Sequence, residues 1–199
     1  MSTTTLHPVL SETLGPSEGT SLRVKQALLI IAGVAALTIA AKIRVPMWPV
    51  PITMQTFAVL VIGAAYGMRL GLATLLAYLA LGAAGLAVFT GEGAGLAYMM
   101  GPTGGYLVGF AVAAGVMGWL AARGWDRTVG GMAGALLIGN AVIYAFGLPW
   151  MAWLFVAERG MAWVLQWGMT NFLLGDALKL ALAAMVLPLA WKAVGGARG

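Results

Sequence analysis

The chain has 199 residues, of which 61% are hydrophobic and only 9% are charged, and its formal net charge is +5. A soluble domain usually carries about 25% charged residues, so this composition excludes an ordinary soluble protein and indicates a membrane protein. The basic residues are scattered singly between apolar runs, which argues against nucleic-acid binding. The chain has no cysteine, and its one histidine, His7, lies in a polar leader. We therefore expect no His/Cys metal site, no cofactor and no enzymatic activity.

Apolar segments of span length follow the polar leader. Residues 1–22 are rich in Ser, Thr, Gly and Pro, and we expect them to form a disordered tail. A membrane-spanning helix needs about 20 apolar residues, or about 17 at the short end. Apolar segments fall at roughly 24–41, 53–67, 70–90, 104–122, 130–148 and 168–191, which makes six helices the natural count. The sequence thus predicts an all-α membrane protein with six transmembrane helices in one compact bundle over residues 23–194, followed by a short tail at 195–199.

Some segment boundaries stay open. The first segment ends in small residues and also resembles a signal peptide, although the apolar chain downstream favours a retained helix. The second segment is short, and Pro149 either kinks or ends the fifth.

Positive residues are divided unequally between the two sides of this bundle. One side holds seven, which are Arg23, Lys25, Arg69, Arg123, Arg127, Lys192 and Arg198, and the other holds three, which are Lys42, Arg44 and Arg159. Because Lys and Arg are enriched in cytoplasmic loops, both termini are predicted to be cytoplasmic. The outer loops are then 42–52, 91–103 and 149–169, and we expect them to form a ligand pocket. Their tryptophans fit an interfacial aromatic belt, or in part an apolar wall over a ligand.

Two opposite charges, Asp176 and Lys179, lie in the apolar stretch 172–189. Three residues apart on a helix, they share one face. A charge near the bilayer centre costs at least about 2.5–3.5 kcal/mol, so both are expected to face a protein interior or a cavity. The pair either holds helices together or binds a small polar ligand through one acceptor-only anion and one donor-only cation. We favour ligand binding.

The first outer loop contains three prolines at 46–51, which forbid a helix and stiffen an extended path. This path delivers Thr53 and Gln55 to the mouth of the second helix. Thr53 fits a helix cap. The amide of Gln55 both donates and accepts, so it suits an amide, a urea group or a carboxylate.

The second outer loop ends in a glycine-rich stretch at 101–110. Free N–H groups near Gly104 and Gly105 suit a carboxylate. The spacing of Gly105 and Gly109 also fits close helix packing, and both roles are compatible. Tyr106 offers one ring and one hydroxyl to a pocket.

Three alanines recur every four residues on the first helix, at Ala32, Ala36 and Ala40. They form a smooth stripe on which another helix could pack, although alanine is abundant in this chain.

Taken together, these motifs resemble the BioY family, the biotin-specific membrane-embedded S components of energy-coupling factor transporters. The resemblance covers about residues 24–191. It rests on three strings, which are Pro-Val-Pro-Ile-Thr-Met-Gln-Thr at 49–56, Gly-Pro-Thr-Gly-Gly-Tyr at 101–106 and Gly-Asp-x-x-Lys at 175–179.

The resemblance implies a six-helix protein of a bacterial or archaeal cell membrane that captures biotin from outside. It also implies a transmembrane coupling (T) component and a pair of cytoplasmic ABC-type ATPases as partners, with the alanine stripe docking the T component. The expected ligand-binding residues are Asp176, Lys179, Gln55, Arg44, Thr53, Tyr106, Gly104, Gly105 and Phe89. We expect Asp176 to accept from the ureido N–H groups, and Arg44 or the N–H groups near Gly104 to hold the carboxylate.

Two alternatives remain from the sequence. The same architecture could serve another small carboxylate vitamin, or the chain could be a non-transporting membrane scaffold in which the charged pair is structural.

Overall fold

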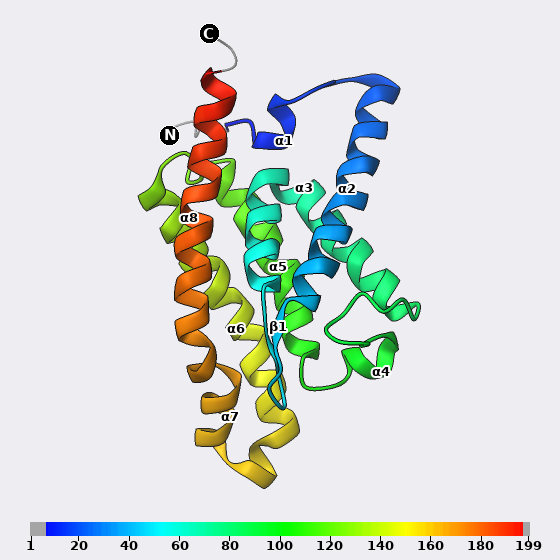
Figure 1. The fold of residues 1–199 in the computed structure, drawn as a ribbon, viewed down its shortest axis with the longest axis vertical. Coiled ribbons are helices and arrows are strands. Elements are labelled where there is room, and N and C mark those ends of the chain that lie inside the picture. Colours follow the sequence, from blue (N-terminus) through cyan, green and yellow to red (C-terminus); the bar gives the residue numbers. More distant parts are fainter. Residues whose placement is uncertain (1–6, 197–199) are drawn as a thin grey trace, which may run out of the picture.

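A computed structural model describes residues 7–196, and this part of the chain is almost wholly helical (Figure 1). The elements in chain order are α1 (Leu10–Thr13), α2 (Gly19–Lys42), β1 (Arg44–Val45), β2 (Ile52–Thr53), α3 (Gln55–Ala83), α4 (Gly95–Met99), α5 (Gly104–Ala121), α6 (Val129–Arg159), α7 (Met161–Gly168), a 3-10 turn (Thr170–Phe172) and α8 (Leu173–Gly196). Within these residues, five helical stretches are long and apolar enough to cross a membrane, namely α2, α3, α5, α6 and the continuous stretch Met161–Gly195. The all-α prediction is confirmed.

Helix α3 doubles back on itself at Gly67. This glycine has φ +80° and ψ 171°, a backbone conformation outside the helical region. A Cβ atom placed on Gly71 would lie 3.2 Å from the Cα atom of Gly63. In a straight helix these two residues would be about 12 Å apart along the axis, so the two halves of α3 run antiparallel. The two segments predicted at 53–67 and 70–90 correspond to these two halves.

The segment predicted at 70–90 ends earlier than expected. Its predicted end at residue 90 is wrong, because α3 ends at Ala83. Gly85 follows with φ +100°, which favours glycine and stops the helix. The ring of Phe89 then folds back over Gly82, where an added Cβ would lie 2.0 Å from the ring. Val88 and Phe89 are therefore buried by a loop rather than by a helix.

The expected outer loop at 149–169 is also wrong, because α6 continues through Pro149 to Arg159 and α7 follows at once. A proline within a helix removes one backbone hydrogen bond. Met151, just beyond Pro149, is fully buried, so packing against the rest of the protein offsets the lost bond and the helix continues. Trp48, at the tip of the β1–β2 hairpin, contacts Phe155 and Trp163 with ring centroids 5.9 and 5.7 Å apart. These rings pack the hairpin against α6 and α7.

The segment expected as a polar tail is placed from residue 7 onward, and residues 1–6 and 197–199 lie outside the described part. His7 donates its backbone N–H to the Ala122 carbonyl at 2.7 Å. Val9 is 3% exposed and lies against the reversal at Gly67. In Figure 1, α1 and the C-terminal end of α8 lie at one end of the bundle, and β1, α4 and α7 lie at the other.

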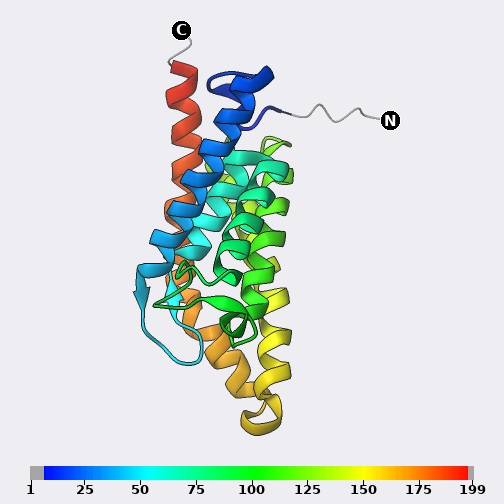
Figure 2. The same ribbon diagram turned by 90° about the vertical axis from the view of Figure 1, so that its right-hand side faces the viewer.

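Helix α5 lies at the centre of the bundle, between α3 and α6. Its close approach depends on glycine. A Cβ atom on Gly118 would lie 2.1 Å from the backbone nitrogen of Met68, and one on Gly109 would lie 3.0 Å from the Cα atom of Ile143. The long helices run roughly along the long axis of the molecule (Figure 2).

We predict opposite effects for two glycine substitutions on α5. Gly118→Ala forces a side chain into the backbone of the α3 reversal and should lower the melting temperature of the detergent-solubilised protein by several degrees, consistent with about 2 kcal/mol or more. Gly115→Ala meets nothing within 4 Å. It gains helix propensity and should be neutral or stabilising by up to about 1 kcal/mol. Equal losses for both variants would contradict this packing.

Candidate functional site

The Asp176–Lys179 pair lies on α8 and is buried within the protein. The Lys179 ammonium lies 2.8 Å from Asp176 Oδ1, and the two side chains are 8% and 5% exposed. The ammonium also donates to the Thr53 carbonyl at 3.0 Å and to the Thr56 hydroxyl at 2.9 Å. Its three donors are thus all used, and the pair connects α8 to the start of α3.

The second carboxylate oxygen of Asp176 is held by α6. The amide of Asn140 donates to Asp176 Oδ2 at 3.3 Å, and the Tyr144 hydroxyl donates to the same atom. Sequence reasoning missed both donors. They stand four residues apart and so share a helix face. An amide and a phenol on one face of an otherwise apolar segment are the signal that could have found them.

A second polar network surrounds Gln55, which is 4% exposed. Its amide donates to the Tyr78 hydroxyl at 2.8 Å, and that hydroxyl donates to the Val88 carbonyl at 2.9 Å. The hydroxyl of Thr90 donates to Gln55 Oε1 at 3.3 Å. Because buried polar groups need partners, this network fixes the loop after α3 against the start of α3.

A cavity opens between these two networks. Its wall combines hydroxyl, amide and charged groups with apolar and aromatic side chains, from the β1–β2 hairpin, α3, the loop after α3, α4, α5, α6 and α8. The lining residues are Val50, Pro51, Thr53, Gln55, Thr56, Thr90, Tyr98, Thr103, Tyr106, Leu107, Phe110, Asn140, Ile143, Tyr144, Phe172, Asp176 and Lys179. A few convergent polar groups within a largely apolar wall are typical of a site for a small organic ligand.

Five of the expected ligand-binding residues line this cavity, and they are Asp176, Lys179, Gln55, Thr53 and Tyr106. Tyr106 turns its ring to the cavity while its hydroxyl donates to the Gly168 carbonyl at 2.7 Å. That hydroxyl therefore anchors α5 to α7.

Four other expected residues do not line the cavity. The Gly104 N–H donates to the Gly101 carbonyl at 3.0 Å, so it is not a free anion donor. Gly105 packs on α6, where an added Cβ would lie 2.3 Å from Trp150 Cβ, and this supports the packing alternative. Phe89 lies behind the wall and stacks on Tyr98 with ring centroids 5.0 Å apart. Arg44 is exposed and lies beside Gly91.

The alanine stripe is only partly free on the surface of α2. Ala32 and Ala36 are exposed, whereas Ala40 is 7% exposed and belongs to the core.

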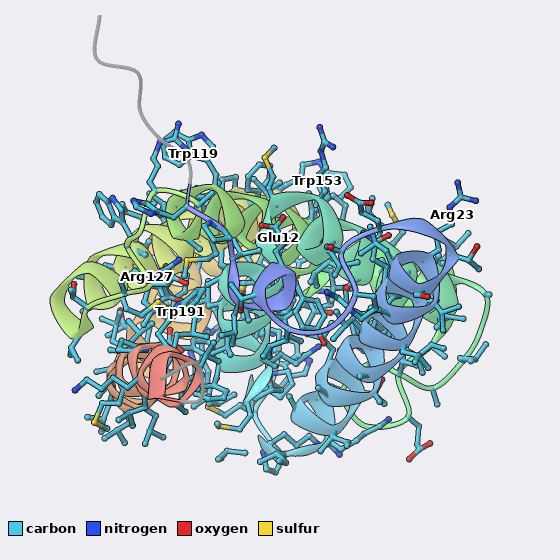
Figure 3. The ribbon with its side chains drawn as sticks, turned by 90° about the horizontal axis from the view of Figure 1, so that it is seen from above. Glu12, Arg23, Trp119, Arg127, Trp153 and Trp191 are labelled. Carbon is cyan, nitrogen blue, oxygen red and sulfur yellow. The ribbon has the colours of Figure 1, made fainter. Side chains whose placement is uncertain are left out.

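A second ion pair, in which Asp126 is buried and Arg127 is half-buried, lies at the opposite end of the bundle. The Arg127 guanidinium lies 3.7 Å from Asp126 Oδ1, and the Trp191 indole donates to Asp126 Oδ2 at 2.6 Å. Arg127 also covers the Trp191 ring, as Figure 3 shows beside the end of α8. Burial raises the pKa of Asp126, while the Trp191 hydrogen bond and Arg127 oppose that rise. This pair lines no part of the cavity.

Comparison with known proteins places this architecture in a family. A family model described as the BioY family matches residues 13–196. The chain belongs to the BioY family. The probable biotin transporter BioY of Pyrococcus horikoshii is 36% identical over 165 residues, which cover 83% of this chain and 95% of that relative. The biotin transporter BioY of Thermotoga maritima is 34% identical over 164 residues, which cover 79% and 92%.

The fold of this BioY family member is also similar to that of a solved structure. The match is to the crystal structure of the S-component for biotin from an ECF-type ABC transporter, with a TM-score of 0.74. It covers 88% of this chain and 95% of that chain at 24% identity, and at that identity the likeness concerns the fold. The family resemblance expected from the three sequence strings is confirmed, and the chain is a multi-pass membrane protein.

We predict strongly non-additive stability effects at the ion pair. Lys179→Met leaves the Asp176 carboxylate buried without its cation and should destabilise the ligand-free protein by about 3 kcal/mol. Adding Asp176→Asn removes the unpaired charge and should recover at least half of that loss. Thermal unfolding in detergent measures both, with Leu178→Met, on an exposed position of the same helix, as the control. Additive losses in the double variant would show that the two charges do not depend on each other.

Proposed function

We propose that this protein captures biotin from outside the cell and serves as the substrate-specific S component of an ECF-type biotin transporter. The observation that carries the proposal is the polar end of the cavity, where a paired carboxylate and ammonium meet the amide of Asn140 and the hydroxyl of Tyr144. Two relatives named as probable biotin transporters are 36% and 37% identical to this chain over 83% and 80% of its length. Its role is transport rather than catalysis.

The chemistry of biotin fits this arrangement of groups. The ureido ring carries two N–H donors and one carbonyl acceptor. The Asp176 carboxylate accepts from such donors. The Lys179 ammonium would donate to such a carbonyl by exchanging one of its three present partners, the Thr53 carbonyl, the Thr56 hydroxyl or Asp176, for the ligand. Leu107, Ile143 and Phe172 line the same cavity and offer apolar surface to the sulfur-containing ring and the aliphatic chain.

The carboxylate of biotin would reach toward the outer rim of the cavity. The backbone N–H of Gly104 is occupied, so Arg44 is the stronger of the two donors expected for this group. Arg44 pairs with Thr53 across β1 and β2, and Thr53 lines the cavity. A guanidinium at this position would attract the anionic end of the ligand from the aqueous side.

The reversal of α3 supports a six-span topology, in which each half of α3 crosses the membrane once. An even number of crossings would put both termini on one side, and the excess of Lys and Arg there favours the cytoplasm. The outer end would then hold the cavity and the β1–β2 hairpin. A T component and a pair of ATPases would complete the transporter in the cell membrane. The exposed part of the alanine stripe, Ala32 and Ala36 on α2, offers a smooth docking surface for the T component.

Equilibrium binding to the purified protein tests the proposal. We expect saturable biotin binding, and both Asp176→Asn and Lys179→Met should weaken it by more than about tenfold, which is about 1.4 kcal/mol. Asp126→Asn and Arg127→Met are the controls, since they alter the ion pair at the other end of the bundle and should leave affinity unchanged. Binding that lipoate displaces more readily than biotin would assign another carboxylate vitamin, and unchanged affinity in both site variants would refute the site.

A further inference from the structure

Three residues in the middle of the loop between α3 and α4 are buried, although the loop has no regular secondary structure. Val88, Phe89 and Thr90 are each less than 9% exposed. Buried backbone carbonyls need hydrogen-bond partners, and a loop has no helix to supply them. In Figure 2 this loop reaches toward the lower end of α2, next to β1.

One ammonium group binds three backbone carbonyls of this loop, and one of them belongs to the buried Phe89. Lys42, the last residue of α2, donates to the Ala87 carbonyl at 2.7 Å and to the Phe89 carbonyl at 2.9 Å, and it also donates to the Gly91 carbonyl. An ammonium has three donors in a compact, rotatable head. Three converging carbonyls therefore match its capacity in full.

The intervening residues of the same loop contact the candidate site. The Val88 carbonyl accepts from the Tyr78 hydroxyl, and the Thr90 hydroxyl donates to Gln55. Thr90 and Gln55 both line the cavity. The loop is thus held from two sides, with residues 87, 89 and 91 bound to Lys42 and residues 88 and 90 bound to the cavity network.

We propose that Lys42 is a positioning residue for ligand binding, which fixes the loop wall of the cavity to the end of α2. This proposal rests on the proposed function, because it takes biotin as the ligand of the cavity. Lys42 does not line the cavity and acts through Thr90 and Gln55. Lys42 is exposed to solvent, so water can replace part of its bonding, and its loss should loosen the loop more than it destabilises the whole protein.

The chain offers a matched control on the same helix. Lys25 also donates to backbone carbonyls, those of Leu14 at 2.7 Å and Pro16 at 3.1 Å, but at the opposite end of α2. Lys42→Met and Lys25→Met each remove an ammonium group that binds backbone carbonyls, and of the two only Lys42 contacts the loop that lines the cavity.

The test combines hydrogen–deuterium exchange without ligand and the biotin dissociation constant. We expect Lys42→Met to speed amide exchange in residues 86–93 by about tenfold and to weaken biotin binding by about tenfold, with a melting temperature close to that of the wild type. Lys42→Arg keeps the charge but spreads its donors over a planar fork, so it should restore part of both losses. Lys25→Met should change neither quantity.

Two results would overturn the proposal. One is unchanged exchange in this loop in Lys42→Met, and the other is faster exchange with unaltered biotin affinity, because the loop would then not position the site. A wild-type protein that binds no biotin would instead refute the proposed function, and the exchange measurement would still show whether Lys42 orders the loop.

Discussion

The buried ion pair on α8 is the constraint on which the cavity depends. Two charges in an apolar chain are tolerable only when each has its hydrogen-bonding capacity filled. Lys179 draws its partners from the hairpin and α3, and Asp176 draws its partners from α6. The polar requirements of one pair thereby bring three separate parts of the chain to a single point, and they leave a cavity beside it.

Glycine makes this convergence possible at the backbone level. The reversal at Gly67 returns the chain along α5, and the absence of a side chain at Gly118 lets the two backbones approach closely. The first half of α3 therefore begins beside the cavity with Gln55 and ends against α5. The second half returns and carries Tyr78 back to the Gln55 amide.

Hydropathy and charge rules were sufficient to predict the class, the order of the apolar segments and the residues at the polar centre. Asp176, Lys179 and Gln55 could be identified because polar groups in apolar segments are costly and need a reason. Asn140 and Tyr144 were missed because their importance depends on facing Asp176 across two helices, a contact that the sequence does not show. The end of α3 and the course of α6 through Pro149 depend on tertiary packing, which local propensity does not determine.

The glycine-rich stretch shows a further limit of sequence reasoning. The sequence alone is consistent with two roles for Gly104 and Gly105, namely free N–H donors for an anion and close helix packing. The structure decides, because the Gly104 N–H is bound to the Gly101 carbonyl and Gly105 packs against Trp150. Phe89 similarly lies one layer behind the cavity, against Tyr98. Apolar composition identifies such residues as buried, but it does not separate the wall of a cavity from the layer that supports it.

The most direct test of this account is an experimental structure of the protein with biotin bound. We predict ligand density in the cavity between α3, α6 and α8, with the ureido nitrogens within hydrogen-bonding distance of the Asp176 carboxylate. Biotin bound elsewhere, with Asp176 and Lys179 still paired with each other and not in contact with it, would contradict the account and leave the pair a purely structural role.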